Sequence, residues 1–545
     1  NKLNRIYFTG VKYIRCNFLI TIRPAYVIME ADDVTAKIVG DFGKWQLQIS
    51  IMMTLLKLPN AWYQLNIIFL APPQNFWCKK PTSFSKYSDE LWRQICSPLI
   101  EEHPCLIFDP DILIQSKFAI DKSTIPMVSC KHFVYDKSQH SRTITSDWDL
   151  VCKKHWLIHF TQCILMWGVL LGGVVFGTLA DKYGRKIPLM IAIVLQSLAS
   201  YIVSAVRWYW LFIINWFILA LACGGIGIIS FVICMEVVSG KWRTLIPILY
   251  HVPFGLGNAI MAVLAYWLRD WRKLEFVLAS LSGLYVFYWF WIPESPRWLL
   301  ATGQTEKALE VLKQAAIVNR REFEFHEYKN SLPNARNKSV GPGFMTFMKL
   351  KNMRKKSLML SGFWFFTGLA FYAFSQFLGA LGKNIFLTVA ITGIISTPGG
   401  LVCACIISKI GRKTTLWIFQ LVTAFCFVAI LLIPRNVFEN DWPRLLFAGI
   451  GFAGMAGTVP VLYLFSGELY PTIGRNAGVG GVSTFARIGS MIAPFVVSLN
   501  DIQEDLPLIL LAISSFVQLL FLLPLPETKG FPLPDTVEQA ENFTG

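Results

Sequence analysis

One arginine lies within an otherwise apolar stretch near the C-terminal end of the chain. Arg487 stands in GVSTFARIGSMIAPF, and Gly480, Thr484, Met491 and Pro494 share its helical face at spacings of three and four residues. An ionisable group costs at least ~2.5–3.5 kcal/mol to place in mid-membrane, so it is a functional candidate. A guanidinium in a cavity can pair a carboxylate or sulfate through two hydrogen bonds. We therefore expect Arg487 and Thr484 to line an anion-binding cavity; a structural ion pair or a snorkelling arginine is the alternative.

Aromatic side chains could enclose the apolar part of such a ligand. Two apolar runs contain aromatic residues at helical spacing, one around SGFWFFTGLAFYAFSQF and one around LYHVPF. Aromatic faces also bind cations. Such a stripe is equally typical of helix packing. The residues expected to bind the apolar part are Trp364, Phe371, Tyr372, Phe374, Tyr250 and Phe254.

Short charged motifs recur at nearly one offset along the chain. Three pairs lie 227, 232 and 233 positions apart: Gly184-Arg185-Lys186 with Gly411-Arg412-Lys413, Glu236…Arg243 with Glu468…Arg475, and Pro293-Glu294-Ser295 with Pro526-Glu527-Thr528. The repetition predicts two halves of similar structure. Two such bundles with a site at their interface are the architecture of alternating-access transporters.

The repeated motifs predict a charge network that locks one conformation. We expect Gly177 to permit a close approach of helices, and Asp181 to meet a basic side chain of a neighbouring bundle segment. Ser408 stands where the second half would repeat Asp181, so the lock should be asymmetric. A simple basic loop is the alternative. The predicted gating residues are Gly177, Asp181, Gly184, Arg185, Lys186, Glu236, Arg243, Glu294, Arg297, Gly411, Arg412, Lys413, Glu468 and Arg475.

The elements that position these residues are membrane-spanning helices. Of the 545 residues 54% are hydrophobic and only 15% charged, against about 25% charged in a soluble domain. A span needs about 20 apolar residues, and twelve such runs are present. They cover roughly 45–70, 156–179, 187–206, 209–234, 246–268, 274–292, 357–380, 385–407, 414–433, 444–466, 477–499 and 506–525. The expected fold is an all-α membrane protein of two six-helix pseudo-repeats with a loop domain between helices 1 and 2.

The net charge of +16 falls in short loops rather than in one patch, which favours a membrane topology over nucleic-acid binding. The segment 293–356 carries thirteen Lys/Arg against six Glu, so we expect it, with both termini, in the cytoplasm. The expected parts are an N-terminal segment 1–44 (1–28 an upstream or isoform-specific extension), a six-helix bundle 45–292 with extracellular loop 71–155, the linker 293–356, a second bundle 357–525 and a tail 526–545.

Cysteines fall into two groups. Seven lie in the basic N-terminal extension or in spans and have no metal-ligand pattern. Five lie in the long polar segment after the first span, where an oxidising exterior permits up to two disulfides and leaves one cysteine over. These candidates are Cys78, Cys96, Cys105, Cys130 and Cys152.

Other chemistry is not indicated. The chain has no GxxxxGK[ST] phosphate loop, and His155 and His159 at the mouth of the second span favour interfacial placement over a metal site. We therefore expect no cofactor, no metal, no nucleotide and no enzyme activity. The spans offer almost no buried acid, which favours uniport or exchange over proton coupling.

The motifs resemble those of the major facilitator superfamily and, within it, solute carrier family 22. The resemblance covers roughly 29–540 and is carried by GTLADKYGRKIP, PESPRWLL, ISKIGRK, GELYPTIGRNAGVG and LPETKGFPLPDT. It implies polyspecific transport of small organic ions. Arginine at position 487 matches the anion and zwitterion members, where cation members carry Asp, and Phe371-Tyr372 match a paired aromatic of the anion pocket. Asn215 and Trp216 depart from the arginine that many members carry early in span 4.

We therefore expect a plasma-membrane carrier of small organic anions or zwitterions such as carnitine-like compounds, working as a uniporter or exchanger. An organic cation transporter is the first alternative, and a non-transporting receptor or sensor on a degenerate transporter fold is the second. The expected partners are the small organic ion and the lipid bilayer, with no nucleic acid. The chain would be a monomer or a weak homo-oligomer.

Overall fold

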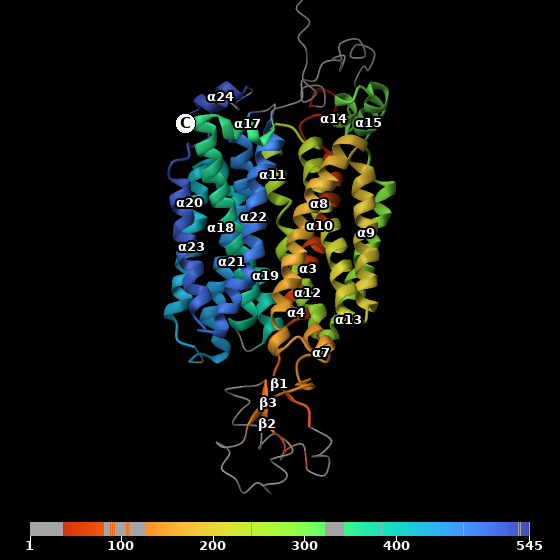
Figure 1. The fold of residues 1–545 in the computed structure, drawn as a ribbon. Helices are drawn as coiled ribbons and strands as arrows, with labels where there is room; N and C mark the ends of the chain where they lie inside the picture. Colours follow the sequence, from red (N-terminus) through yellow and green to blue (C-terminus); the bar gives the residue numbers. More distant parts are fainter. Residues whose placement is uncertain are drawn as a thin grey trace, which may run out of the picture.

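The computed structural model describes most of the chain. Its described residues are 36–80, 88, 90, 92, 105–109, 126–240, 242–321, 343–381, 384–435, 437–471, 474–531, 534 and 536–543. Cys96 and residues 1–28 lie outside them. Figure 1 shows a helical body with a small extension of strands at one end.

The first half of the body holds six spans. The first is broken into α2 (Lys44–Leu55), α3 (Lys57–Leu65) and α4 (Ile67–Leu70). The next are α8 (Trp156–Tyr183), α9 (Lys186–Ala205) and α10 (Tyr209–Val237). The fifth is α11 (Trp242–Leu249) with α12 (Pro253–Leu268), and the sixth is α13 (Trp271–Gly283) continued by the 3₁₀ helix η4 (Leu284–Phe290). Proline at the start of α12 lacks the N–H that would continue the ladder, so the helix breaks there.

The second half repeats this order. Its spans are α18 (Lys351–Leu381), α19 (Ile385–Ile410), α20 (Arg412–Leu432), α21 (Trp442–Leu469), α22 (Arg475–Ser498) and α23 (Leu506–Leu522). Within the described residues, nine helices are individually long and apolar enough to cross a membrane. The broken first and sixth spans and the shorter α23 complete the twelve that the sequence predicts.

The halves lie side by side and meet along two pairs of helices. In Figure 1 α8–α13 form one bundle and α18–α23 the other, and α12 packs against α19 while α8 packs against α22. Within each half, glycine allows helices to touch backbone to backbone. A Cβ on Gly172 would lie 1.9 Å from the carbonyl oxygen of Leu221, and one on Gly368 equally close to that of Ala486. These contacts hold α8 on α10 and α18 on α22.

Gly177 does not make the close approach that the motif predicts. A Cβ added there would meet nothing within 4 Å, because this side of α8 faces away from its neighbours. The contact is made earlier on the same helix, at Gly172. The prediction for Gly177 is therefore wrong.

The two ends of the body differ. We call the end with the short helices α14 (Pro296–Ala301), α15 (Thr305–Val318), α17 (Phe344–Lys349) and α24 (Val537–Asn542) the helical end (Figure 1). The strand end carries β1 (Phe76–Cys78) paired antiparallel with β4 (Phe133–Tyr135), β2 (Leu106–Phe108) with β3 (Met127–Ser129), and α7 (Ile144–Trp148). Disulfides join Cys78 to Cys130 and Cys105 to Cys152, and so tie the strands to the start of α8.

Candidate functional site

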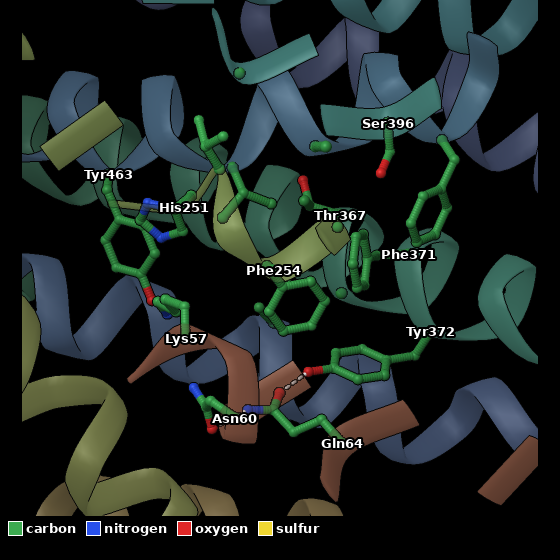
Figure 2. A pocket seen from close by; sticks show the side chains of 18 of the residues that line it. Lys57, Asn60, Gln64, His251, Phe254, Thr367, Phe371, Tyr372, Ser396 and Tyr463 are labelled. Carbon is green, nitrogen blue, oxygen red and sulfur yellow. Dashed lines mark hydrogen bonds between the residues drawn. The ribbon is translucent and has the colours of Figure 1, made fainter. Parts of the chain in front are cut away.

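A cavity lies between the two bundles near the middle of the body. Side chains from α3 and α12 of the first half and from α18, α19, α21 and α22 of the second half line it (Figure 2). Its polar and aromatic lining is Lys57, Asn60, Gln64, His251, Phe254, Trp364, Thr367, Phe371, Tyr372, Ser396, Thr397, Phe452, Tyr463, Ser483 and Arg487. Among the described residues that line it there is no carboxylate, so its two basic side chains, Lys57 and Arg487, dominate its charge.

Arg487 begins a hydrogen-bonded chain that crosses from one half to the other. Its Nη1 donates to the Tyr372 hydroxyl at 3.1 Å, and that hydroxyl donates to Gln64 Oε1. Gln64 Nε2 then donates to Asn60 Oδ1 at 2.7 Å. Figure 2 shows Tyr372 and Gln64 meeting in the cavity. Because Arg487 has five N–H donors, most remain available to a ligand.

Lys57 is the second cation of the cavity, and the sequence analysis did not select it as a site residue. It stands on α3 one turn before Asn60, and its Nζ lies 4.5 Å from the centre of the Tyr250 ring. No acidic partner pairs with it in the described part of the chain. The signal that could have found it was the same as for Arg487, an unpaired charge within a predicted span.

Aromatic rings form one wall of the cavity. Phe254 of α12 meets Phe371 of α18 at 5.8 Å, and Phe371 stacks on Phe452 at 5.1 Å. Trp364 packs edge-on against Tyr463 at 4.5 Å. The predicted aromatics Trp364, Phe371, Tyr372 and Phe254 therefore do gather around one space.

Three predicted binding residues lie elsewhere. Phe374 is fully buried against Phe427 of α20, because α18 has turned its side chain away from the cavity. Tyr250 is buried within the first half, where its hydroxyl lies 2.6 Å from Ser230 Oγ. Thr484 donates to the backbone oxygen of Gly480, and the cavity face of α22 is formed by Ser483, Ala486 and Arg487. Residue spacing shows which residues share a face of a helix, but not which face of that helix lines the cavity.

His251 presents a defined edge to the cavity. Its Nδ1 lies 3.0 Å from the backbone oxygen of Pro247, which only accepts, so Nδ1 carries a proton. The ring stacks on Tyr463 of the second half at 5.9 Å. This leaves Nε2 as a hydrogen-bond acceptor when the ring is neutral.

The first-half motifs meet at the helical end. Gly184, at a φ of +95°, turns the chain from α8 into α9. The Glu294 carboxylate accepts the Arg185 N–H at 2.6 Å and the Lys186 N–H, so it stabilises the start of α9. The Arg185 guanidinium then pairs with Glu236 at the end of α10, at 2.9 Å. We call this group, with Asp181, the first network.

The second half repeats this arrangement. Gly411 has a φ of +106°, and the Glu527 carboxylate accepts the N–H groups of Arg412 and Lys413 at the start of α20. Arg412 pairs with Glu468 at 2.7 Å. Burial alone would raise the pKa of Glu527, but hydrogen bonds from backbone N–H groups, including those of Arg412, Lys529 and Thr528, hold it below its ordinary value. With Thr528, this group is the second network.

Asp181, Arg297 and Lys413 make contacts within their own half. Asp181 pairs with Arg185 of its own motif at 2.7 Å, not with a neighbouring bundle segment, because the α8–α9 turn folds back on itself. Arg297 donates to the Val238 oxygen at 3.0 Å and so covers the end of α10. Arg243 and Arg475 stand at the starts of α11 and α22. Lys413 Nζ donates to backbone oxygens of Leu523 and Leu525.

One buried acid was overlooked. Glu275 of α13 is fully buried, and accepts hydrogen bonds from Asn66 Nδ2 at 2.5 Å and Ser200 Oγ at 3.0 Å. This single acid is consistent with the expectation that the spans offer almost no buried acid. Glu275 lies within the predicted span 274–292, two residues after the basic RDWRK loop, and was not selected as a site residue. Glu275 lies within the first half and does not line the cavity.

Two six-helix bundles around a central polar cavity define a membrane transporter of the alternating-access class. Residues 123–540 match the model of a family described as "Sugar (and other) transporter". Solute carrier family 22 member 6 of Pseudopleuronectes americanus is 34% identical over 415 residues, covering 75% of this chain and 73% of that protein. The chain belongs to this transporter family and, within it, to solute carrier family 22. The family predicted from the motifs is confirmed.

Other similar proteins cover more of the chain. The organic cation transporter protein of Drosophila melanogaster is 29% identical over 528 residues, or 94% of this chain and 95% of that protein. Mouse solute carrier family 22 member 3 is 28% identical over 536 residues and covers 94% of this chain and 96% of its own. Their family, like that of this chain, is one of transporters and not of enzymes.

Solved structures support the same fold. The proton:xylose symporter XylE bound to 6-bromo-6-deoxy-D-glucose aligns with a TM-score of 0.58 at 18% identity, over 90% of this chain and 98% of that one. A partially occluded inward-open XylE from E. coli aligns with a TM-score of 0.56 at 16% identity, over 90% of this chain and all of that one. The predicted major facilitator fold is confirmed.

Proposed function

We propose that this transporter carries small organic anions, or zwitterions with an exposed anionic group, across the plasma membrane. The observation that supports this most is the pair of cations, Lys57 and Arg487, in a cavity whose described lining holds no carboxylate. The negative group of an anion would offset part of this positive charge. A cation would add a third positive charge to a site that already has two, which is unfavourable in a low-dielectric space.

The ligand's polar and apolar parts would bind different walls. Arg487 would hold a carboxylate or sulfate through its available N–H groups, and Lys57 would approach from α3. The rings of Phe254, Phe371 and Trp364 would cover an apolar body. Since Arg487 also donates to Tyr372, which bonds Gln64 of the other half, an anion on Arg487 would compete with the chain that joins the halves.

The orientation in the membrane forms part of the proposal. We propose that the helical end lies in the cytoplasm, because the described parts of 293–356 and 526–545 are at that end and the sequence of the first segment is strongly basic. The strand end would face the exterior. Its two disulfides fit an oxidising compartment. We propose uniport or exchange as the mode, since the described cavity lining offers no acid for proton binding.

Transport of organic cations is the second candidate. The aromatic wall of Phe371, Phe254 and Trp364 could hold a quaternary ammonium through its ring faces. A relative named as an organic cation transporter also resembles the chain over most of its length. This candidate requires the ligand to avoid Lys57 and Arg487.

Uptake by cells that make the protein tests the choice. Labelled benzoate, a betaine and tetraethylammonium would be compared in wild type, Arg487→Gln and Lys57→Gln, with surface amounts measured. Losing a hydrogen bond to a charged group is worth about 1.5–3 kcal/mol, so the KM for benzoate should rise roughly 10–100-fold in Arg487→Gln. Lys313→Gln, an exposed charge on α15, is the matched control. Uptake of tetraethylammonium alone, unchanged in both variants, would refute the anion proposal.

A further inference from the structure

At the strand end, the two halves contact each other around the ring of Phe386. Phe386, in the first turn of α19, is 7% exposed and packs among three rings of the first half. It lies 5.6 Å from Phe69 of α4, 5.0 Å from His140 of the segment before α7, and 5.6 Å from Tyr266 of α12. This contact joins the two halves at the strand end, so it must separate when the halves part there.

His140 is held firmly in this contact. Its backbone segment is bound to the turn between α12 and α13, because Ser141 N and Oγ both bond the Arg269 oxygen at 2.8 Å. The imidazole is 5% exposed, and its Nε2 is buried without a hydrogen-bond partner among the described residues. A buried nitrogen without a partner favours the neutral ring, since a charged ring would leave a donor unsatisfied.

The charged groups around His140 also favour its neutral ring. Arg269 is the cation that faces His140; it bonds the backbone oxygens of Tyr266 and Ser138. Asp136, on the same segment as His140, has its carboxylate bound by Ser138. The described first turns of α4 and α19 bring aromatic and aliphatic side chains but no charge. Burial and, to a smaller degree, Arg269 lower the pKa of His140 to about 4.

We propose that the His140–Phe386 contact makes opening of the strand end depend on the pH of the solution on that side. When the halves part there, His140 becomes exposed to water and binds a proton at its ordinary affinity. Protonation then prevents the contact from re-forming, so acid favours the open state and neutral pH the closed one. This inference uses the proposed orientation, but it does not depend on which ion is transported.

The size of the effect follows from proton linkage. The ring binds protons with a pKa of about 4 when enclosed and near 6.5 when free. Well above pH 6.5 almost no protein in either state carries this proton, so the equilibrium is nearly unaffected. Below it, only the open state gains a proton. The ratio of open to closed protein should rise roughly tenfold between pH 7.5 and 5.5.

Cys163 supplies a reporter already present in the chain. It lies on α8 towards the strand end, where its Sγ meets the Met491 oxygen of α22 at 3.2 Å across the two halves. A membrane-impermeant maleimide added outside should reach it only when that end opens. Labelling lost in Cys163→Ser identifies the signal. Comparing each variant with wild type at the same pH cancels the pH dependence of the thiol itself.

The expected result is a wild-type to His140→Phe ratio of labelling rates that rises roughly tenfold from pH 7.5 to 5.5. Phe keeps the ring and removes the titration, and His140→Gln serves if that variant does not reach the surface. His132→Gln, an exposed histidine of the same extension, should behave as wild type. A ratio that stays constant with pH would overturn the proposal, as would the same loss of pH dependence in His132→Gln.

Discussion

The two motif networks at the helical end share a plan but distribute their hydrogen bonds differently. In both, a carboxylate binds the first N–H groups of a helix, Glu294 on α9 and Glu527 on α20. In the first network one cation serves two acids, because Arg185 pairs with Glu236 and Asp181. In the second, one acid has two donors, because Glu468 accepts from Arg412 and from the Thr528 hydroxyl.

The two halves therefore share the geometry of the networks more closely than the charge of every member. The turn glycines, the helix-start carboxylate and the buried ion pair recur, whereas the third partner is an aspartate in one half and a hydroxyl in the other. Each network lies within its own bundle. They therefore stabilise each half by itself, whereas the Tyr372–Gln64 bond and the Phe386 contact are among the contacts that join the halves.

Removing the central arginine of each network should reveal the largest difference in stability between the two networks. Breaking a buried ion pair typically costs about 3–5 kcal/mol, because the remaining charge stays buried. We expect Arg185→Leu to lower the melting temperature of the detergent-purified protein more than Arg412→Leu. Glu236 has no other hydrogen-bond donor in the described structure, whereas Glu468 keeps Thr528.

The control for that prediction removes both partners. Arg185→Leu combined with Glu236→Leu leaves no unpaired charge at that position, so part of the lost stability should return. Equal melting temperatures for Arg185→Leu and Arg412→Leu would show that Thr528 gives Glu468 no useful support.

Thr528→Val tests the hydroxyl of the second network. Valine keeps the shape of this buried side chain but removes its bond to Glu468. A buried group that loses one partner is destabilised by about 1–3 kcal/mol, so the melting temperature should fall by less than in Arg412→Leu. The matched change in the first half is Ser295→Ala, whose hydroxyl accepts from the Trp298 N–H instead of reaching an acid. A larger loss in Ser295→Ala would contradict this ranking.

Asp181→Asn should have the smallest effect. Its side chain is 74% exposed, and exposed ion pairs contribute at most about 1 kcal/mol. Its melting temperature should stay close to that of wild type and become indistinguishable at high salt, because salt screens exposed charges. A clear loss of stability that persists in 1 M salt, about a 3 Å Debye length, would mean that Asp181 is a true third member of the first network.

Much of the architecture could be predicted because it depends on short stretches of sequence and on the offset between them. Apolar runs of membrane length placed all twelve helices to within a few residues, and the offset between repeated motifs divided them into two halves. Arg487 was found for the same reason, since one charge in an apolar run is conspicuous without any neighbour. Lys57 and Glu275 carried the same signal, because they lie within the predicted spans 45–70 and 274–292, but they were not selected as site residues.

The rest was decided by packing between distant segments. A helical period says that Thr484 and Arg487 lie near one another, but the rotation of α22 that brings Ser483 to the cavity depends on α18, about a hundred residues away in sequence. The same holds for Phe374, turned to α20, and for Phe386, enclosed by three rings of the other half. The spans, the repeat and the family motifs follow from residue order alone, because each depends on residues that are close together in the sequence or recur at a nearly fixed offset. Which charges share the cavity and which rings pack together at the strand end depends on how the helices pack, because those contacts join residues that are far apart in the sequence.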